Sequence, residues 1–434
     1  MPDASNTYLE RQPSFAEALR FWLKLGCISF GGPAGQIAIM QHELVDRRQW
    51  IDQRSFLLGL NFCTLLPGPE ATQLAAYIGW RLHGILGAVV AGTLFVLPGA
   101  LVLLALSWIA AAKGDTPVVG AIFYGLKPVV IAIIAHAVWR IGRRTLKNWQ
   151  SVALAVAAFL GIFAAGIDFP WIVIAAGAIG WFAGRRGHSP FATVGHGPRN
   201  GDGADVAPAT AGAMKRLAIL VSVFVVLWVV PVGSTIAIFG AQPFLGVAEL
   251  FTKAAFVTFG GAYAVLPYVA EEAVRTYAWL SPGEMLNGLA LAETTPGPLI
   301  LVLQYVGFFA GWNYPDGLPQ AAAAIIGAAL TTYVTFLPSF MFILAGAPYI
   351  AGLGDRPALG SALGAITAAV VGVILNLGVF LAREVFLPAQ GVDWGSIALA
   401  LAALLAMLRF SFAIHWYVVT GAALGLAYHF LAAQ

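Results

Sequence analysis

The sequence has little charge. Of its 434 residues, only 10% are Asp, Glu, Lys or Arg, whereas 60% are hydrophobic. Soluble globular proteins carry roughly 25% charged residues, so this chain lacks the polar surface that a soluble protein needs. The composition therefore predicts an integral membrane protein built from apolar helices in a lipid bilayer. At about 20 apolar residues per crossing, little length is left for a soluble catalytic domain.

The sequence also lacks the usual signatures of chemistry. Its two cysteines, Cys27 and Cys63, lie in apolar stretches and give neither a disulfide framework nor a metal-binding spacing. Zinc-protease, phosphate-loop, dinucleotide-binding and serine-hydrolase motifs are missing. The net charge of +3 is small and scattered, which argues against nucleic-acid binding. We therefore expect no enzymatic activity, no cofactor, no metal and no ATP coupling. The N-terminus does not resemble a cleavable signal peptide and is expected to be retained.

The chain contains an internal repeat. Shifting the sequence by 229 residues places Lys24 on Lys253 and Trp50 on Trp279. The same shift places the triplets Phe-Gly-Gly and Pro-Gly-Pro of residues 24–69 on identical triplets. Within that stretch, 13 of 46 positions are identical, which shared apolar composition hardly produces by chance. Such self-similarity at one offset predicts two copies of one unit.

The repeat divides the chain into four parts. We expect a first repeat at 1–184, a cytoplasmic linker at 185–215, a connecting transmembrane helix at 216–240 and a second repeat at 241–434. Loop 140–147 holds four Lys or Arg residues, whereas its counterpart near 382–393 holds one. Because cytoplasmic loops are enriched in these residues, equivalent loops are expected on opposite sides of the membrane. The predicted fold is an all-α polytopic membrane protein with two inverted-topology repeats and a cytoplasmic N-terminus.

Each repeat contains two interruptions rich in glycine and proline. The runs 55–66 and 69–82 are each too short to cross ~30 Å of hydrocarbon, so the helix is expected to break inside the membrane. Depending on whether such segments re-enter or cross, nine to thirteen crossings are possible. In inverted-repeat transporters, the positive N-termini of half-helices face anionic substrates. Proline suits the first position of such a half-helix, as at Pro69 and Pro298.

We therefore expect up to four half-helix N-termini to meet at one substrate site. Its candidate residues are Phe30, Gly31, Gly32, Pro67, Gly68, Pro69, Phe259, Gly260, Gly261, Pro296, Gly297 and Pro298. The alternative is that the glycines only allow tight helix packing and that each Pro-Gly-Pro only kinks a span.

Lys24 and Lys253 are candidates for neutralising a divalent anion at this site. Each lies in an otherwise apolar stretch ahead of a glycine pair, where inserting a lysine costs about 2.5 to 3.5 kcal/mol. The alternative is an ion pair at the membrane interface, because Glu17 and Glu249 lie within two helical turns of them.

A coupling proton has four candidate carriers, which are Glu70, Glu293, Lys127 and His136. For each, a helix cap or an interhelical hydrogen bond is the alternative. Trp50 and Trp279 are expected to anchor the chain at a membrane interface.

These motifs resemble the chromate ion transporter family. The resemblance rests on Phe-Gly-Gly-Pro at 30–33 after a helix with a lysine, on Pro-Gly-Pro at 67–69, and on their repetition from 259 and 296. It covers nearly the whole chain and indicates the long form with two homologous domains. It implies chromate efflux across the bacterial inner membrane, chromate resistance, and drive by the proton gradient; some members are associated with sulfate. The second repeat departs at Ala262 and Leu299, where the first has Pro33 and Glu70.

The residues and the resemblance together predict an oxyanion carrier that works by alternating access. Chromate and sulfate are both tetrahedral dianions, and the choice of chromate rests on the resemblance alone. The alternatives are a sulfate or other oxyanion transporter, an anion channel and, least favoured, a membrane enzyme.

Overall fold

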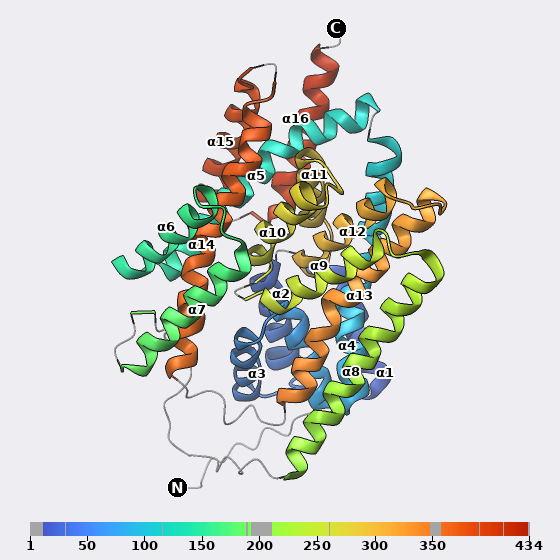
Figure 1. The fold of residues 1–434 in the computed structure, drawn as a ribbon, viewed down its shortest axis with the longest axis vertical. Coiled ribbons are helices and arrows are strands. Elements are labelled where there is room, and N and C mark those ends of the chain that lie inside the picture. The colour runs from blue at the N-terminus through green and yellow to red at the C-terminus, as the bar shows by residue number, and fades with distance from the viewer. Residues whose placement is uncertain are drawn as a thin grey trace.

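The fold is entirely helical in the part of the chain that the structure describes (Figure 1). The computed structural model describes residues 12–30, 32–114, 116–187, 190–191, 211–259, 261–347, 357–389, 391–410 and 412–432. The predicted all-α class is therefore confirmed. Most of the expected linker lies outside the described residues.

The first repeat runs from α1 to α7. Its helices are α1 (Phe15–Ile28), α2 (Gly32–Gln41), η1 (His42–Arg47), α3 (Gln53–Leu65), α4 (Glu70–Lys113), α5 (Pro117–Thr145), α6 (Trp149–Phe163) and α7 (Phe169–Arg185). Helix α4 is kinked, because the backbone of His83 and Gly84 is not helical. The connecting helix α8 (Ala211–Phe239) follows.

The second repeat shows the same order of helices. It consists of α9 (Phe244–Val257), α10 (Ala262–Glu271), η2 (Glu272–Thr276), α11 (Pro282–Thr294), η3 (Leu299–Leu301), α12 (Val302–Asn313), α13 (Gln320–Gly346), α14 (Pro357–Phe386), α15 (Trp394–Arg409) and α16 (Ile414–Ala432). Helices α1 and α9 are both 14 residues long, and α3 and α11 are both 13. Both pairs are offset by the same 229 residues that relate the two halves of the sequence.

The two repeats are interlocked. Helices α6 and α7 of the first repeat pack against α14 of the second, and the counterparts α15 and α16 pack against α5 of the first. The approach is close enough to require glycine. A Cβ on Gly125 of α5 would collide with the backbone carbonyl of Gly421 in α16, and one on Gly180 of α7 with that of Ser361 in α14. Each repeat therefore completes the packing of the other.

Helices α4 and α13, which are counterparts, cross in opposite directions. Gly92 of α4 lies against the ring of Phe340 in α13. Further along α4, Gln304 of α12 joins the carbonyl oxygen of Ala100 to the hydroxyl of Thr332 on α13, at 2.8 and 2.9 Å. Residue numbers thus rise along α4 where they fall along α13, as the ribbon also shows (Figure 1). Inverted repeats require this relation; the sides of the membrane on which the loops lie stay a prediction.

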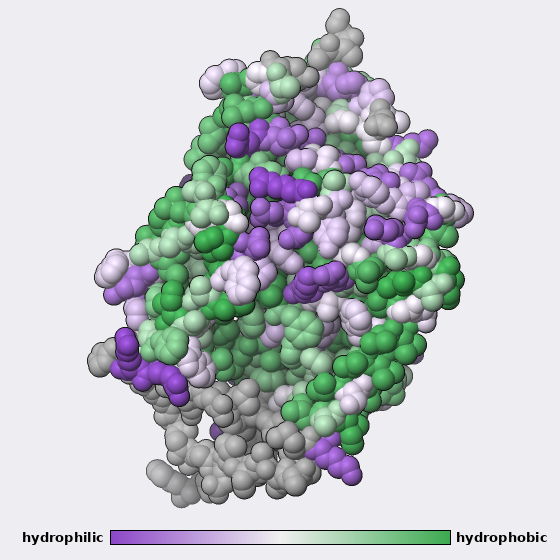
Figure 2. Space-filling view, in the orientation of Figure 1, coloured by the Kyte–Doolittle hydropathy of each residue, from purple (hydrophilic) through white to green (hydrophobic). Residues whose placement is uncertain are grey.

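The surface fits a membrane protein. Among the described residues, five helices are long and apolar enough to cross a bilayer, namely Glu70–Lys113, Pro117–Thr145, Lys215–Phe239, Gln320–Gly346 and Ala358–Phe386. Helices α6 and α7 are apolar but shorter, with 15 and 17 residues. Figure 2 shows hydrophobic side chains along both flanks, including α8 at the lower right, and hydrophilic ones gathered across the upper centre. On α8, Val225, Val229 and Val230 are each more than half exposed.

The expectation of interfacial tryptophans is wrong. Trp50 is 1% exposed and Trp279 is 4% exposed, so both lie inside the protein. Trp279 stacks on Tyr277 with ring centroids 4.3 Å apart, and the guanidinium of Arg48 lies over the ring of Trp50. Both indoles follow a π-helical turn, η1 or η2, which directs them into the core.

Candidate functional site

The first helix of each repeat ends at a residue with a hydroxyl group. Ser29 follows α1, and its Oγ donates to the carbonyl oxygen of Leu25 at 2.6 Å. Thr258 follows α9, and its Oγ1 donates to that of Ala254 at 2.5 Å. Both residues are fully buried. Each hydroxyl is bonded within its own helix. The backbone carbonyl oxygens of Ser29 and Thr258 lie beyond the last helical turn and need a partner from elsewhere.

That partner is the Pro-Gly-Pro turn of the other repeat. The backbone N–H of Gly68 donates to the carbonyl oxygen of Thr258 at 2.8 Å, and the N–H of Gly297 donates to that of Ser29 at 2.9 Å. Gly68 and Gly297 have φ values of 120° and 91°, which residues with a Cβ rarely adopt. The four interruptions therefore meet as two reciprocal pairs, each joining one repeat to the other.

Two buried glutamines hold these turns. Gln36 Nε2 donates to the carbonyl oxygen of Gly297 at 2.6 Å and to that of Ser29 at 3.2 Å. Gln73 Nε2 donates to the carbonyl oxygen of Pro67 at 2.7 Å. Both side chains are fully buried. The amide groups thus satisfy carbonyls that a broken helix would otherwise leave unpaired.

New helices begin after every interruption, as the sequence predicts. Gly32 opens α2 and Gly261 precedes α10, with φ values of 72° and 97°. Phe30 and Phe259 are partly buried beside these starts. The remaining two candidates from the glycine pairs lie outside the described residues; they are Gly31 and Gly260.

The prolines of the second interruption sit slightly differently from the expectation. Pro69 and Pro298 are the residues just before α4 and η3 rather than their first helical residues. Their ψ angles of 104° and 134° keep them extended. Pro67 and Pro296 precede the glycines within the same turns. Helices α4 and η3 therefore still start directly after each turn.

Glu293 is the carboxylate at the second turn. It lies in the last turn of α11, three residues before Pro296, and its Oε1 accepts a hydrogen bond of 2.6 Å from the Tyr263 hydroxyl. Tyr263 is the second residue of α10, so this bond links the half-helices on either side of the site. Arg140 of α5 interacts electrostatically with Glu293.

Glu70 occupies a related place at the first turn. It is the first residue of α4, where a negative charge is favoured by the helix dipole, and Arg144 of α5 interacts with it electrostatically. Arg140 and Arg144 are one helical turn apart, and His136 precedes Arg140 by another turn. One stretch of α5 therefore faces both carboxylates.

Lys127, on α5, lies beside the first turn of α11. The Pro-Gly-Pro turn is at the opposite end of α11. A Cβ on Gly283, in the first turn of α11, would stand 3.3 Å from Lys127 Nζ. Its electrostatic partners are Glu384 and Glu284. The structure therefore does not bring Lys127 together with Glu70 and Glu293.

The lysine pair also lies apart from the turns. Lys24 and Lys253 are exposed on the outer faces of α1 and α9. Lys253 Nζ lies 2.5 Å from Glu249 Oε1, one helical turn earlier, in a pair whose side chains are 59% and 49% exposed. The ion-pair interpretation therefore fits Lys253, because its charge is already matched on the surface. Neither lysine shares the buried surroundings of Gly68 and Gly297.

Sequence comparison assigns the family. The sequence pattern of the chromate transporter family matches residues 16–181 and again residues 245–426, so it covers both repeats and omits α8. The chain belongs to the chromate transporter family.

Two relatives in this family carry the name chromate transport protein. The one from Cupriavidus metallidurans is 30% identical over 96% of this chain and 92% of its own length. The one from Pseudomonas aeruginosa is 32% identical over 86% and 82%. The uncharacterised transporter YwrB of Bacillus subtilis is 30% identical over 35% of this chain and 78% of its own length, which is about one repeat. No solved structure matches the fold significantly.

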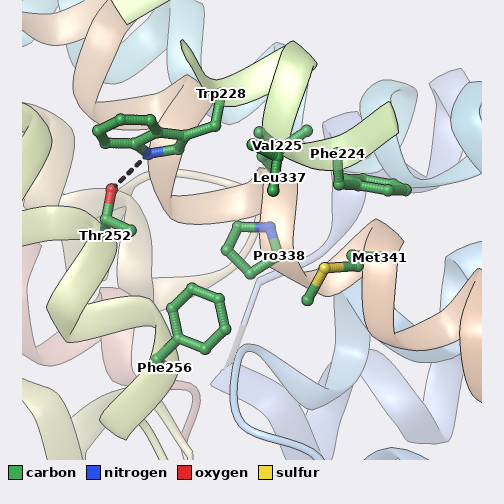
Figure 3. A pocket seen from close by; sticks show the side chains of 8 residues that line it. All are labelled: Phe224, Val225, Trp228, Thr252, Phe256, Leu337, Pro338 and Met341. Carbon is green, nitrogen blue, oxygen red and sulfur yellow. Dashed lines mark hydrogen bonds between the residues drawn. The ribbon is translucent and has the colours of Figure 1, made fainter. Parts of the chain in front are cut away.

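A cavity of about 200 Å³ lies elsewhere in this chromate transporter family member, between α8, α9 and α13 (Figure 3). It is lined by Phe224, Val225, Trp228, Thr252, Phe256, Leu337, Pro338 and Met341. Its one polar contact is already made, since Trp228 Nε1 donates to Thr252 Oγ1 at 2.8 Å. An apolar cavity without charge or free donors does not suit a dianion.

Several site residues escaped prediction from the sequence. Gln36 and Gln73 follow the two interruptions of the first repeat within about one helical turn, and the second repeat has Val265 and Val302 at those positions. A glutamine in an otherwise apolar run, shortly after each interruption, is a sequence signal for a buried polar side chain. Tyr263 carried none, because its counterpart is an alanine. Arg140 and Arg144 lie in the stretch 140–147 that the sequence marks as a basic loop, whereas in the structure both belong to α5.

Proposed function

We propose that this protein carries chromate across the bacterial inner membrane, in the direction of efflux, and so confers chromate resistance. Membership of the chromate transporter family and the names of two relatives support chromate as the ion. The observation that carries the mechanism is the pair of reciprocal hydrogen bonds that join Gly68 to Thr258 and Gly297 to Ser29.

These bonds bring the starts of new helices to the contact between two repeats. The first backbone N–H groups of a helix have no partner within it and carry the positive end of its dipole, so they suit a tetrahedral dianion. The proposed site comprises both Pro-Gly-Pro turns and both Phe-Gly-Gly segments. Lys24 and Lys253 stay outside it, because both are exposed on the outer faces of their helices.

Transport would follow from rocking of one repeat against the other. Because helices such as α4 and α13 run in opposite directions across the contact, the two repeats can exchange conformations, which opens the site to each side in turn. A channel would need a continuous pore through these turns, and saturable transport distinguishes the carrier from it. Sulfate, as a dianion of the same shape, is the runner-up substrate.

We propose that Glu293 carries the coupling proton, so that chromate leaves in exchange for protons. Its carboxylate is bonded to Tyr263 across the site and interacts with Arg140. A proton on Glu293 would remove the charge that Arg140 faces and change how α11 packs on α5, which would link the protonation state of Glu293 to the side on which the site opens. Glu70 at the first turn is the second candidate for this role.

The coupling is tested by replacing Glu293 with Gln. In everted membrane vesicles, Glu293→Gln should take up chromate at a rate that no longer responds to a proton gradient. The matched control is Glu384→Gln, an exposed carboxylate at the end of α14 that should respond like wild type. A Glu293→Gln protein with the full gradient response would show that the proton travels elsewhere.

A further inference from the structure

Two buried polar side chains from different repeats converge on Gly68. If Gly68 carried a Cβ, that atom would lie 2.7 Å from Gln73 Nε2 and 2.8 Å from Ser339 Oγ. Gln73 is fully buried at the start of α4, and Ser339 of α13 is 2% exposed. Only a residue without a Cβ therefore lets the amide and the hydroxyl lie this close to the turn.

These groups retain hydrogen-bonding capacity. Gln73 Nε2 carries two hydrogens, and one is donated to the carbonyl oxygen of Pro67. Ser339 Oγ lies on the other side of the glycine, 2.8 Å from the place of a Cβ on Gly68. Next to them, Gln73 Oε1 and Thr72 Oγ1 are buried without a partner. Buried polar groups are nearly always paired, so the Thr72 hydroxyl is available as a further donor to a bound group.

The backbone at the same place adds donors. Helix α4 begins at Glu70, and the first amide that bonds back along the chain is that of Gln73, to the carbonyl oxygen of Pro69. The N–H groups of Glu70, Ala71 and Thr72 therefore have no intrahelical partner. Amide, hydroxyl and helix N-terminus together form a set of donors, which is the chemistry that recognises an oxyanion.

The second Pro-Gly-Pro turn lacks this set. The counterparts of Thr72 and Gln73 at the offset of 229 residues are Leu301 and Val302. After the extra loop around 312–320 the offset becomes 240, and the counterpart of Ser339 is Gly99. A Cβ on Gly297 would instead stand 3.3 Å from the Leu301 side chain and 3.6 Å from the Cα of Gly99. The carbonyl of Gly297 is also taken, by Gln36. Gly297 thus faces Leu301 and Gly99 where Gly68 faces Gln73 and Ser339, although the backbones of the two turns match.

We propose that the first Pro-Gly-Pro turn is the one that binds the oxyanion, with Gln73 Nε2 and Ser339 Oγ donating hydrogen bonds to it, and that the second turn is structural. This rests on the proposed function, which assigns the turns to an oxyanion without distinguishing them. Because Ser339 belongs to the second repeat, the binding set is complete only while α13 packs on the first repeat. Sliding of α13 along α4 would therefore release the anion.

The test removes the two donors singly. Gln73→Val introduces the residue that the second repeat already has at position 302, and Ser339→Ala removes only a hydroxyl. Each should raise the KM for chromate uptake into proteoliposomes about tenfold or more, since each loses a hydrogen bond to a charged ligand. The control is Thr331→Val, which removes another buried unpaired hydroxyl two turns earlier on α13 and should leave the KM unchanged.

The outcomes separate this inference from the function on which it rests. Wild-type protein that takes up neither chromate nor sulfate would reject the proposed function. Wild-type uptake with an unchanged KM in both donor variants would reject the role of Gln73 and Ser339 alone. Size-exclusion chromatography of each purified variant confirms folding. If Gln73→Val does not fold, the KM of Ser339→Ala decides the question, because its side chain differs by a single oxygen.

Discussion

At the scale of single residues, burial separates the polar groups that serve the site from those that serve the surface. Gln36 and Gln73 are fully buried and bond to the carbonyls of broken helices. Lys24 and Lys253 stand at matched repeat positions but are exposed. Residues that recur in both repeats therefore share a local environment. For the Pro-Gly-Pro motifs this environment is a buried turn, and for the lysines it is an outer helix face.

We expect Lys253→Ala to have little effect on stability or on chromate uptake. The ion pair with Glu249 is more than a third exposed on both sides, and exposed pairs stabilise a protein by about 0 to 1 kcal/mol. Thermal unfolding in detergent should change little, and chromate uptake by everted vesicles should stay close to wild type, as it should for Lys24→Ala. Loss of uptake in either variant, at normal levels of the protein in the membrane, would show that the lysines contribute to the substrate site.

At the scale of helices, the interruptions decide the architecture. Helix α3 ends at Leu65 and α4 begins at Glu70, and the same break recurs between α11 and η3. The turn between them needs a positive φ at its glycine. A helix that continued through this point would leave the carbonyl of Thr258 or Ser29 without its partner in the other repeat.

Gly68→Ala tests the break. Alanine at a φ of 120° is strained by about 1 to 3 kcal/mol, and its Cβ would occupy the space that Gln73 and Ser339 face. Chromate uptake should be lost. The matched control is Gly166→Ala in the α6–α7 turn, which has a φ of 63° and open space for a Cβ. It should lose some stability in thermal unfolding yet keep its uptake, and equal loss of uptake in both variants would mean that strain alone is responsible.

At the scale of the whole molecule, the two repeats form one interlocked body. The exchange of α6–α7 and α15–α16 between repeats buries close glycine contacts, so neither repeat is complete alone. Helix α8 lies between the two regions that match the family, and we expect it to supply the additional crossing that lets the second repeat enter the membrane from the opposite side.

Reporter fusions test the inversion. Fusions after residue 147 and after residue 389 follow counterpart helices, α5 and α14. A phosphatase reporter, active only outside the cytoplasm, should be inactive at 147 and active at 389, and a cytoplasmic fluorescent reporter should give the opposite pattern. The same side for both fusions would contradict inverted repeats.

Much of this organisation could be predicted from the sequence because it is local. Glycine and proline mark where α1 and α3 end, and the offset between Pro67 and Pro296 reveals the repeat. The pairing of Gly68 with Thr258 could not be predicted, because hydrogen bonds between distant breaks depend on tertiary packing. The exposure of Lys24 could be predicted, because Glu17, Arg20 and Lys24 recur at helical spacing on the face of α1 opposite its buried residues. Trp50 lies outside a regular helix, so no periodicity shows whether it is buried.

The central claim is that this protein exchanges a tetrahedral dianion for protons at the turns between its repeats. The most direct measurement is chromate uptake by proteoliposomes that contain the purified protein, with a proton gradient imposed or collapsed and with sulfate as competitor. We predict saturable uptake that the gradient accelerates and that ceases in Gly68→Ala. Uptake that rises linearly with concentration and ignores the gradient would contradict a proton-coupled carrier and indicate a channel.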